Sequence, residues 1–132
     1  MSNTKAICFR VSDNDVIEGT ILGLSLHMTD DETVSGIALL ANYGPIIIDP
    51  EQKPIEFVVS GTARTLILGD EAEIILSLTG STLFTTGEEI ALVARLNQDA
   101  SKGAATYAVK PEGKRPTVYK NQKVVRVECP KA

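Results

Sequence analysis

Acidic side chains cluster at two points along the chain, and their oxygens are the ligands that calcium prefers. The first cluster is Asp13-Asn14-Asp15 with Glu18, and the second is Asp30-Asp31-Glu32. An EF-hand calcium loop beginning at Asp13 would need an oxygen ligand at Ile17 and a glycine at Glu18, so that pattern fails. Short polar side chains bond their own backbone in turns instead. We therefore interpret both clusters as exposed turns and assign no metal site and no cofactor.

The sequence contains few of the residues and motifs that are typical of catalytic sites. His27 is the only histidine, and most general bases and zinc sites rely on that side chain. With a single histidine no Ser-His-Asp order is informative, and neither GxxxxGK(S/T) nor GxGxxG occurs. We expect His27 to be a structural or surface residue. The sequence therefore predicts no catalytic residues, no cofactor-binding residues and no enzyme activity.

Two cysteines lie near opposite ends of the chain, at Cys8 and Cys129. The sequence shows no apolar leader and no apolar run near the roughly 18 residues that a membrane helix needs, so we expect a cytosolic protein without membrane contact. Thiols stay reduced in that compartment, which favours two small buried cysteines. A disulfide that joins the first strand to the last is the alternative, and the spacing does not decide between them.

Charge divides the chain after residue 101. Residues 102–132 contain eight Lys/Arg against Glu112 and Glu128, a net charge of +6, whereas residues 1–101 contain five basic and fifteen acidic residues, a net charge of −10. Opposite charges on one chain favour contact between the two segments. We predict an acidic β body over 1–101 and an extended basic C-terminal arm over 102–132, docked on its own body or on a neighbouring subunit.

The basic arm supplies the residues that we expect to contact a partner. Lys110-Pro111 and Arg115-Pro116 preclude regular structure between them. Residues 122–127 favour a strand, which could add to the sheet of a neighbour. The expected contact residues are Lys110, Lys114, Arg115, Tyr119, Lys120, Lys123 and Arg126.

Alternation of apolar and polar residues is the dominant structural signal. Aromatic residues are few, with three Phe, three Tyr and no Trp, so the core must be aliphatic. Residues 7–11 and 22–26 each place apolar side chains on one face of a strand. Turn signals recur about every 8–12 residues, as in sandwiches and barrels. We predict a single mainly β domain, a sandwich or barrel of about eight to ten short strands with at most one short helix.

Several segments leave the type of element open. Thr86-Gly87-Glu88-Glu89 fits a helix capping box, so residues 88–97 are where a helix would lie, although their apolar residues also alternate as in a strand. We favour a strand there and another over 72–78. Gly61 and Thr79-Gly80-Ser81 are interpreted as breaks between strands. Ile46-Ile47-Ile48 lies among prolines, which rule out a helix and favour an edge strand or a loop there.

The Gly-punctuated strands over 61–96 and the basic arm from Lys102 onward resemble, in general character, small all-β virion proteins of tailed phages. These include capsid decoration (cement) proteins and tail-tube-like subunits. The resemblance implies a non-enzymatic structural protein of the virion, made in the host cytoplasm, that stabilises a capsid or similar lattice through subunit contacts. Its expected partners are other copies of the chain, a capsid lattice, or both.

Nucleic-acid binding through the basic arm is the alternative function. Lys and Arg would contact phosphates, and Tyr107 and Tyr119 would stack on bases. The acidic body and a sequence pI of about 5.0 argue against this function, since dedicated binders usually show a basic face and a pI well above neutral.

Overall fold

The structure of the protein is a computed structural model that describes residues 4–13, 19–43, 55–82, 87–110, 113 and 115–129. These residues form eight β-strands and no helix. The prediction of a mainly β protein is therefore confirmed over the described part of the chain. The strands are β1 (Thr4–Ser12), β2 (Gly19–Thr29), β3 (Thr33–Tyr43), β4 (Ile55–Leu68), β5 (Glu71–Ser81), β6 (Glu89–Leu96), β7 (Lys102–Lys110) and β8 (Thr117–Val127).

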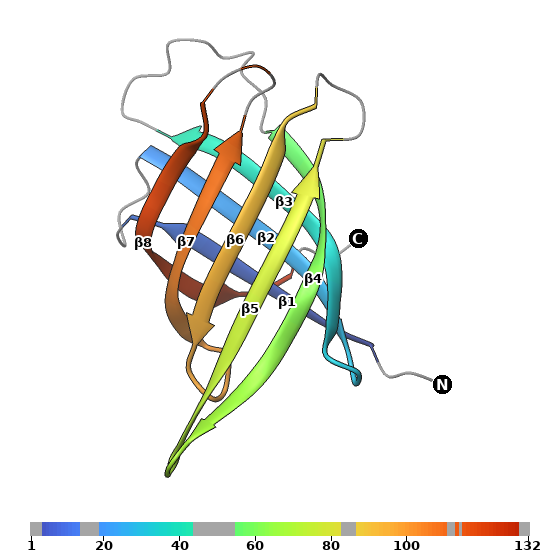
Figure 1. The fold of residues 1–132 in the computed structure, drawn as a ribbon, viewed down its shortest axis with the longest axis vertical. Coiled ribbons are helices and arrows are strands. Elements are labelled where there is room, and N and C mark those ends of the chain that lie inside the picture. The colour runs from blue at the N-terminus through green and yellow to red at the C-terminus, as the bar shows by residue number, and fades with distance from the viewer. Residues whose placement is uncertain are drawn as a thin grey trace.

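The described strands close into a barrel in which each strand pairs antiparallel with its neighbours in sequence, and β8 returns to pair with β1 (Figure 1). Of the two architectures that the turn spacing predicted, the described strands adopt the barrel. Because the strands run alternately up and down, the turns after β2, β4 and β6 lie at one end, which we call the turn end. The exposed turn expected at Asp30-Asp31-Glu32 is found there, and a second turn lies at residues 69–70.

Residues 88–97, for which the sequence fits either a helix or a strand, contain strand β6. Its burial alternates strictly, with Ile90, Leu92, Ala94 and Leu96 buried and the intervening side chains exposed. A helix would bury residues three and four apart, whereas this period of two belongs to a sheet with one face on the core. The strand predicted over 72–78 is likewise part of β5. The strand interpretation is confirmed for both segments.

The segment from Lys102 onward is part of the barrel rather than a separate extended arm over its described length. β7 pairs with β6 along its length, and β8 pairs with both β7 and β1. The strand expected over 122–127 begins earlier, at Thr117. Gln122 and Val124 on β8 are buried, so this strand completes the core. The described residues of this segment therefore pair with strands of their own chain.

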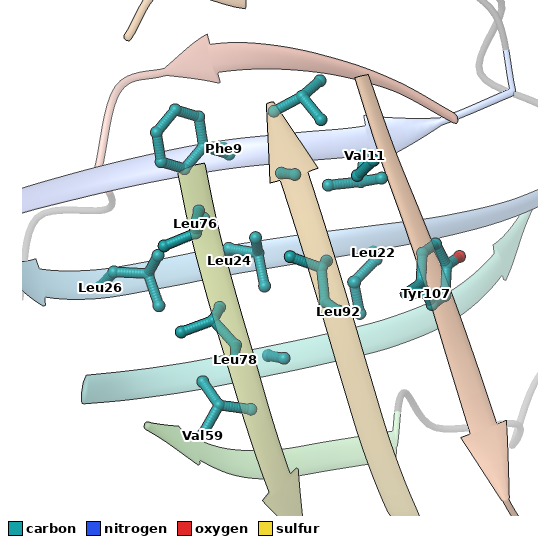
Figure 2. Packing of buried hydrophobic residues seen from close by; sticks show 14 of the residues in the cluster. Phe9, Val11, Leu22, Leu24, Leu26, Val59, Leu76, Leu78, Leu92 and Tyr107 are labelled. Atoms are coloured by element: carbon teal, nitrogen blue, oxygen red, sulfur yellow. The ribbon is translucent and has the colours of Figure 1, made fainter. Parts of the chain in front are cut away.

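Side chains from strands far apart in sequence fill the barrel interior. Leu76 and Leu78 of β5 and Leu92 of β6 point toward the apolar side chains of β1 and β2 (Figure 2). The interior is aliphatic with a few aromatic rings, including Phe9 and Phe57, each almost fully buried. Fully burying one such side chain stabilises the fold by about 1.5–3 kcal/mol. The aliphatic core expected from composition is thus present.

Two glycines interpreted as breaks lie inside continuous strands, so that interpretation was wrong. Gly61 is within β4 and Gly80 within β5. A Cβ on Gly61 would lie 1.7 Å from the carbonyl oxygen of Ser77, a distance that no side chain tolerates. Glycine in a strand marks close approach of a neighbouring backbone, which is the device that lets a sheet curve into a barrel.

Cys8 and Cys129 form a disulfide, so the expectation of two reduced thiols was wrong. β1 and β8 pair with Cys8 opposite Val127, which places Cys129 just beyond the last paired residue. The two Cα atoms lie 5.2 Å apart, within the range that a disulfide spans. The bond joins the ends of the chain across the β1–β8 seam. Ile46-Ile47-Ile48, expected to be an edge strand or a loop, lies outside the described residues.

Candidate interaction surface

The residues expected to contact a partner are spread along the length of the barrel. Lys110 ends β7 and Arg115 precedes β8, both toward the end opposite the turn end. Lys123 and Arg126 lie on β8 nearer the turn end, and Lys120 lies between the two groups. Lys114 lies outside the described residues. The structure thus places these side chains on one side of the barrel without bringing them into one cluster.

Charge is segregated around the circumference of the barrel as well as along the chain. Strands β7 and β8 contain five basic residues and no acidic one. Strands β3, β4 and β5 contain Glu56, Glu71 and Glu73 against a single base, Arg64. These two groups of strands lie on different sides of the closed barrel (Figure 1). The barrel therefore presents a basic wall over β7 and β8 and a weakly acidic wall over β3 to β5, where Glu56 and Glu71 outnumber the single base Arg64. Glu73 lies apart from that wall, paired with Arg95.

Two neighbouring rows of outward side chains build the basic surface, which we define as Arg10, Arg95, Lys102 and Lys123. In one row Ala104 stands opposite both Arg95 and Lys123. In the other, Val125 stands opposite both Lys102 and Arg10. Adjacent strands are about 4.8 Å apart, so long basic side chains from four strands share this surface.

A shallow depression crosses the basic surface, and among the described residues Glu73 is the one acidic side chain that lines it. The Glu73 carboxylate accepts two hydrogen bonds from the Arg95 guanidinium, at 2.6 Å from Nη2 and 3.0 Å from Nε. This pair neutralises part of the charge at one side of the depression. Lys102 and Lys123 line the other side. An anionic group of a partner would be attracted to this side of the depression.

Three members of the basic surface were not among the expected contact residues: Lys102, which lies in the basic arm, and Arg10 and Arg95. Arg10 and Arg95 belong to residues 1–101, where the summed charge is strongly acidic. The usable signal was alternation: Arg10 stands between buried Phe9 and Val11, so its side chain must point outward. That Arg10 and Arg95 lie beside β8 and β7 follows only from the strand order of the closed barrel.

Tyr119 is not free to serve as a surface platform. Its ring stacks on the ring of Tyr107, with centroids 4.7 Å apart and an interplanar angle of 19°. Tyr119 is half-buried against the core, and Tyr107 is almost fully buried. One face of each ring is therefore occupied by the other, and a nucleic-acid base could not stack on that face.

The hydroxyl of Tyr107 is buried without a hydrogen-bond partner among the described residues. Burial raises the pKa of this phenol well above its ordinary value, because the ionised form would lose its hydration. An orphaned buried hydroxyl costs free energy in the folded state. The free energy of unfolding of the barrel is therefore expected to fall at alkaline pH, where the Tyr107 phenol ionises in the unfolded state first.

The turn between β2 and β3 is held by its own side chains. The hydroxyl groups of Thr29 and Thr33 both donate to Asp31, the latter at 2.8 Å. These hydrogen bonds, that from Thr29 first, lower the pKa of the Asp31 carboxyl. The interpretation of this acidic cluster as an exposed turn is confirmed. Asn14, Asp15 and Glu18 of the other cluster lie outside the described residues.

His27 is exposed on the outer face of β2. Within the described ranges no three His, Cys, Asp or Glu side chains gather in a group that could hold a metal ion. The described residues contain no helix that could cross a membrane. Comparison of the chain with protein-family models and with curated proteins finds no significant match.

Proposed function

We propose that this protein is a non-enzymatic structural component of a virion that stabilises a capsid or similar lattice through subunit contacts. The observation that carries the proposal is the pairing of a basic wall, β7 and β8, with a weakly acidic wall, β3 to β5, on one barrel with an apolar core. Complementary charged surfaces orient docking and fix its register. A subunit with both signs on different sides can contact copies of itself or a lattice in a defined orientation.

Apolar side chains on the acidic wall add a second kind of contact. Ile37 of β3 lies opposite Val58 of β4, and both are exposed on the outer face together with Leu39. Adjacent exposed apolar side chains mark protein interaction surfaces more often than isolated ones do. A partner seated on this wall would cover them.

Incorporation into particles is the decisive measurement. Virus particles from a culture that carries the gene would be purified on a density gradient and analysed by quantitative mass spectrometry. We expect the chain to copurify at a fixed ratio to the major capsid subunit. A chain that stays wholly in the soluble fraction would refute the virion assignment.

The basic surface offers variants for the same assay. Lys102→Glu with Lys123→Glu reverses two charges and is expected to reduce particle occupancy, whereas Lys102→Arg with Lys123→Arg keeps the charge and serves as the matched control. Deleting residues 122–132 is unsuitable as a test, because it removes half of β8 and with it buried Val124. Surface charge can be changed without opening the barrel.

Nucleic-acid binding is kept as a second candidate because Arg95, Lys102 and Lys123 line one depression. Contact with three phosphates of a single strand predicts that the logarithm of affinity falls with the logarithm of salt concentration with a slope of about −2. Fluorescence anisotropy with labelled oligonucleotides measures this slope. Absence of binding at low salt, or binding that Lys102→Glu leaves unchanged, would exclude this surface as a nucleic-acid site.

A further inference from the structure

The hairpin of β4 and β5 extends past the barrel wall at the turn end. β4 stops pairing with β3 at Thr62, whereas its pairing with β5 continues to Leu68 opposite Glu71. β5 in turn pairs with β6 only from Ile74 onward. Residues 63–73 are thus a two-stranded ribbon, which projects beyond the other strands at the bottom of Figure 1.

Three consecutive large apolar side chains are exposed at the tip of the ribbon. Leu66 is 44% exposed, Ile67 73% and Leu68 51%, and Ile67 exceeds every other large apolar side chain in the described residues. Strand alternation places Leu66 and Leu68 on one face of the ribbon and Ile67 on the other. Both faces of the ribbon therefore present apolar surface to water, a feature that marks interaction sites.

One edge of the ribbon is also unpaired. The N–H of Ala63 donates to the carbonyl oxygen of Glu32 at 2.9 Å, on the side away from β5. Alternate residues point their backbone groups to the same side, so the N–H and C=O of Thr65 and Ile67 also face away from β5. Within the described ranges no strand pairs with them there. Such an edge is a template for a further strand.

Charge along the edge makes the ribbon complementary to itself. Arg64 lies where the edge leaves the barrel, Asp70 and Glu71 lie at its tip, and residues 65–69 carry no charge. Charged side chains usually protect an edge strand from pairing, and this run lacks them. An antiparallel copy would place each Arg64 near the acidic tip of the other ribbon. A parallel copy would place like charges together.

We propose that the edge formed by residues 64–68 pairs antiparallel with the same edge of a second copy of this chain, giving a two-fold symmetric dimer. Thr65 of each copy would exchange backbone hydrogen bonds with Ile67 of the other, and the two Leu66 side chains would stand opposite each other. Such a contact is self-complementary and closes on itself. The inference rests on the proposed assembly role and deepens it by naming a second copy as a partner.

Analytical ultracentrifugation of the full chain from micromolar to millimolar concentration tests the proposal. The mass is expected to rise from 14.1 kDa to twice that value. Thr65→Pro removes an N–H that faces the open edge, and Ile67→Lys adds a charge to the ribbon. Each is expected to raise the dimer dissociation constant by about tenfold or more, with the far-ultraviolet circular dichroism unchanged.

Val93→Lys is the matched control, because Val93 is a comparably exposed apolar residue on β6, away from the ribbon. It is expected to dimerise as strongly as the wild type. A wild type that stays monomeric over the whole range, or ribbon variants that dimerise as strongly as the wild type, would overturn the proposal.

A charge exchange between copies tests the antiparallel orientation. Arg64→Glu alone and Glu71→Arg alone each place like charges together in their homodimers, so both are expected to be weakened. Mixing the two variants restores an opposite pair at both ends of the shared edge, and a heterodimer is expected to form. A mixture that remains as weakly associated as either variant would exclude the antiparallel pairing.

Dimerisation and particle incorporation are separate measurements. A chain that is found in particles but is monomeric in solution would overturn the dimer and leave the proposed function standing. A chain that dimerises through the ribbon but is absent from particles would overturn the virion role and leave the dimer standing.

Discussion

The rings of Tyr107 and Tyr119 stack across β7 and β8 at a centroid distance of 4.7 Å, which joins the last strand of the barrel to its core. Tyr119, one of the expected contact residues, therefore also packs against the core. Stacked aromatic pairs contribute about 0.5–1.5 kcal/mol beyond the apolar area that they bury. The pair helps to hold β8 in place next to β1.

Tyr119→Ala is expected to lower the free energy of unfolding by about 2–4 kcal/mol, because it removes both the stack and a half-buried ring. Val118→Ala changes the adjacent, 49% exposed side chain and is expected to change stability by less than about 0.5 kcal/mol. Urea denaturation followed by circular dichroism measures both values. Equal losses in the two variants would show that the stack contributes nothing measurable.

Tyr107→Phe tests the orphaned hydroxyl and its pH dependence. At neutral pH the variant is expected to be as stable as the wild type, or more stable by about 1 kcal/mol, since it removes a buried hydroxyl that has no hydrogen-bond partner among the described residues. The folded pKa of Tyr107 is raised, so the unfolded state releases this proton first. The wild type therefore keeps its stability below the unfolded pKa of about 10 and loses about 1.4 kcal/mol per pH unit above it.

Comparing urea midpoints of wild type and Tyr107→Phe at pH 7, 9, about 10.5 and about 11 isolates the contribution of this phenol, because every other titrating group is shared. The gap between the two proteins should widen above pH 10. Parallel curves across the series would contradict the assignment of a raised pKa to Tyr107.

Loss of the Cys8–Cys129 bond should be costly, since it closes almost the whole chain, with a sequence separation of 121. Cys8→Ala with Cys129→Ala is expected to lower the free energy of unfolding by about 3–5 kcal/mol. The double variant should match the wild type in reducing agent when thermal unfolding is followed by calorimetry. A wild type that melts at the same temperature with and without reductant would argue against a stabilising disulfide.

Gly61→Ala places a Cβ against the Ser77 carbonyl and is expected to cost more than about 3 kcal/mol or to prevent folding. Gly23→Ala is the control within a neighbouring part of the barrel, because its Cβ would meet Leu39 at an ordinary 4.0 Å. Expression level and thermal midpoint separate the two. Similar behaviour of both variants would show that the backbone at residue 61 moves aside.

Period-two alternation was sufficient to predict strands, including β6, although the capping-box pattern just before it also fits the start of a helix. The pattern could not show that β1 and β8 meet, because their pairing depends on the curvature of every strand between them. For the same reason, alternation could not predict the disulfide or the surface that Arg10 and Lys102 share. Gly61 was misjudged because a close backbone approach and a turn favour the same residue.

The order of the strands has a consequence for how the chain folds. Apart from the β1–β8 seam, every described ladder joins strands that are adjacent in sequence, so each can form as a local hairpin. The seam must bring together residues from opposite ends of the chain, and that loop closure carries the largest entropic cost. We therefore expect the seam to form last in the reduced chain. An oxidised chain enters folding with its ends already tethered, so its rate of refolding should be faster.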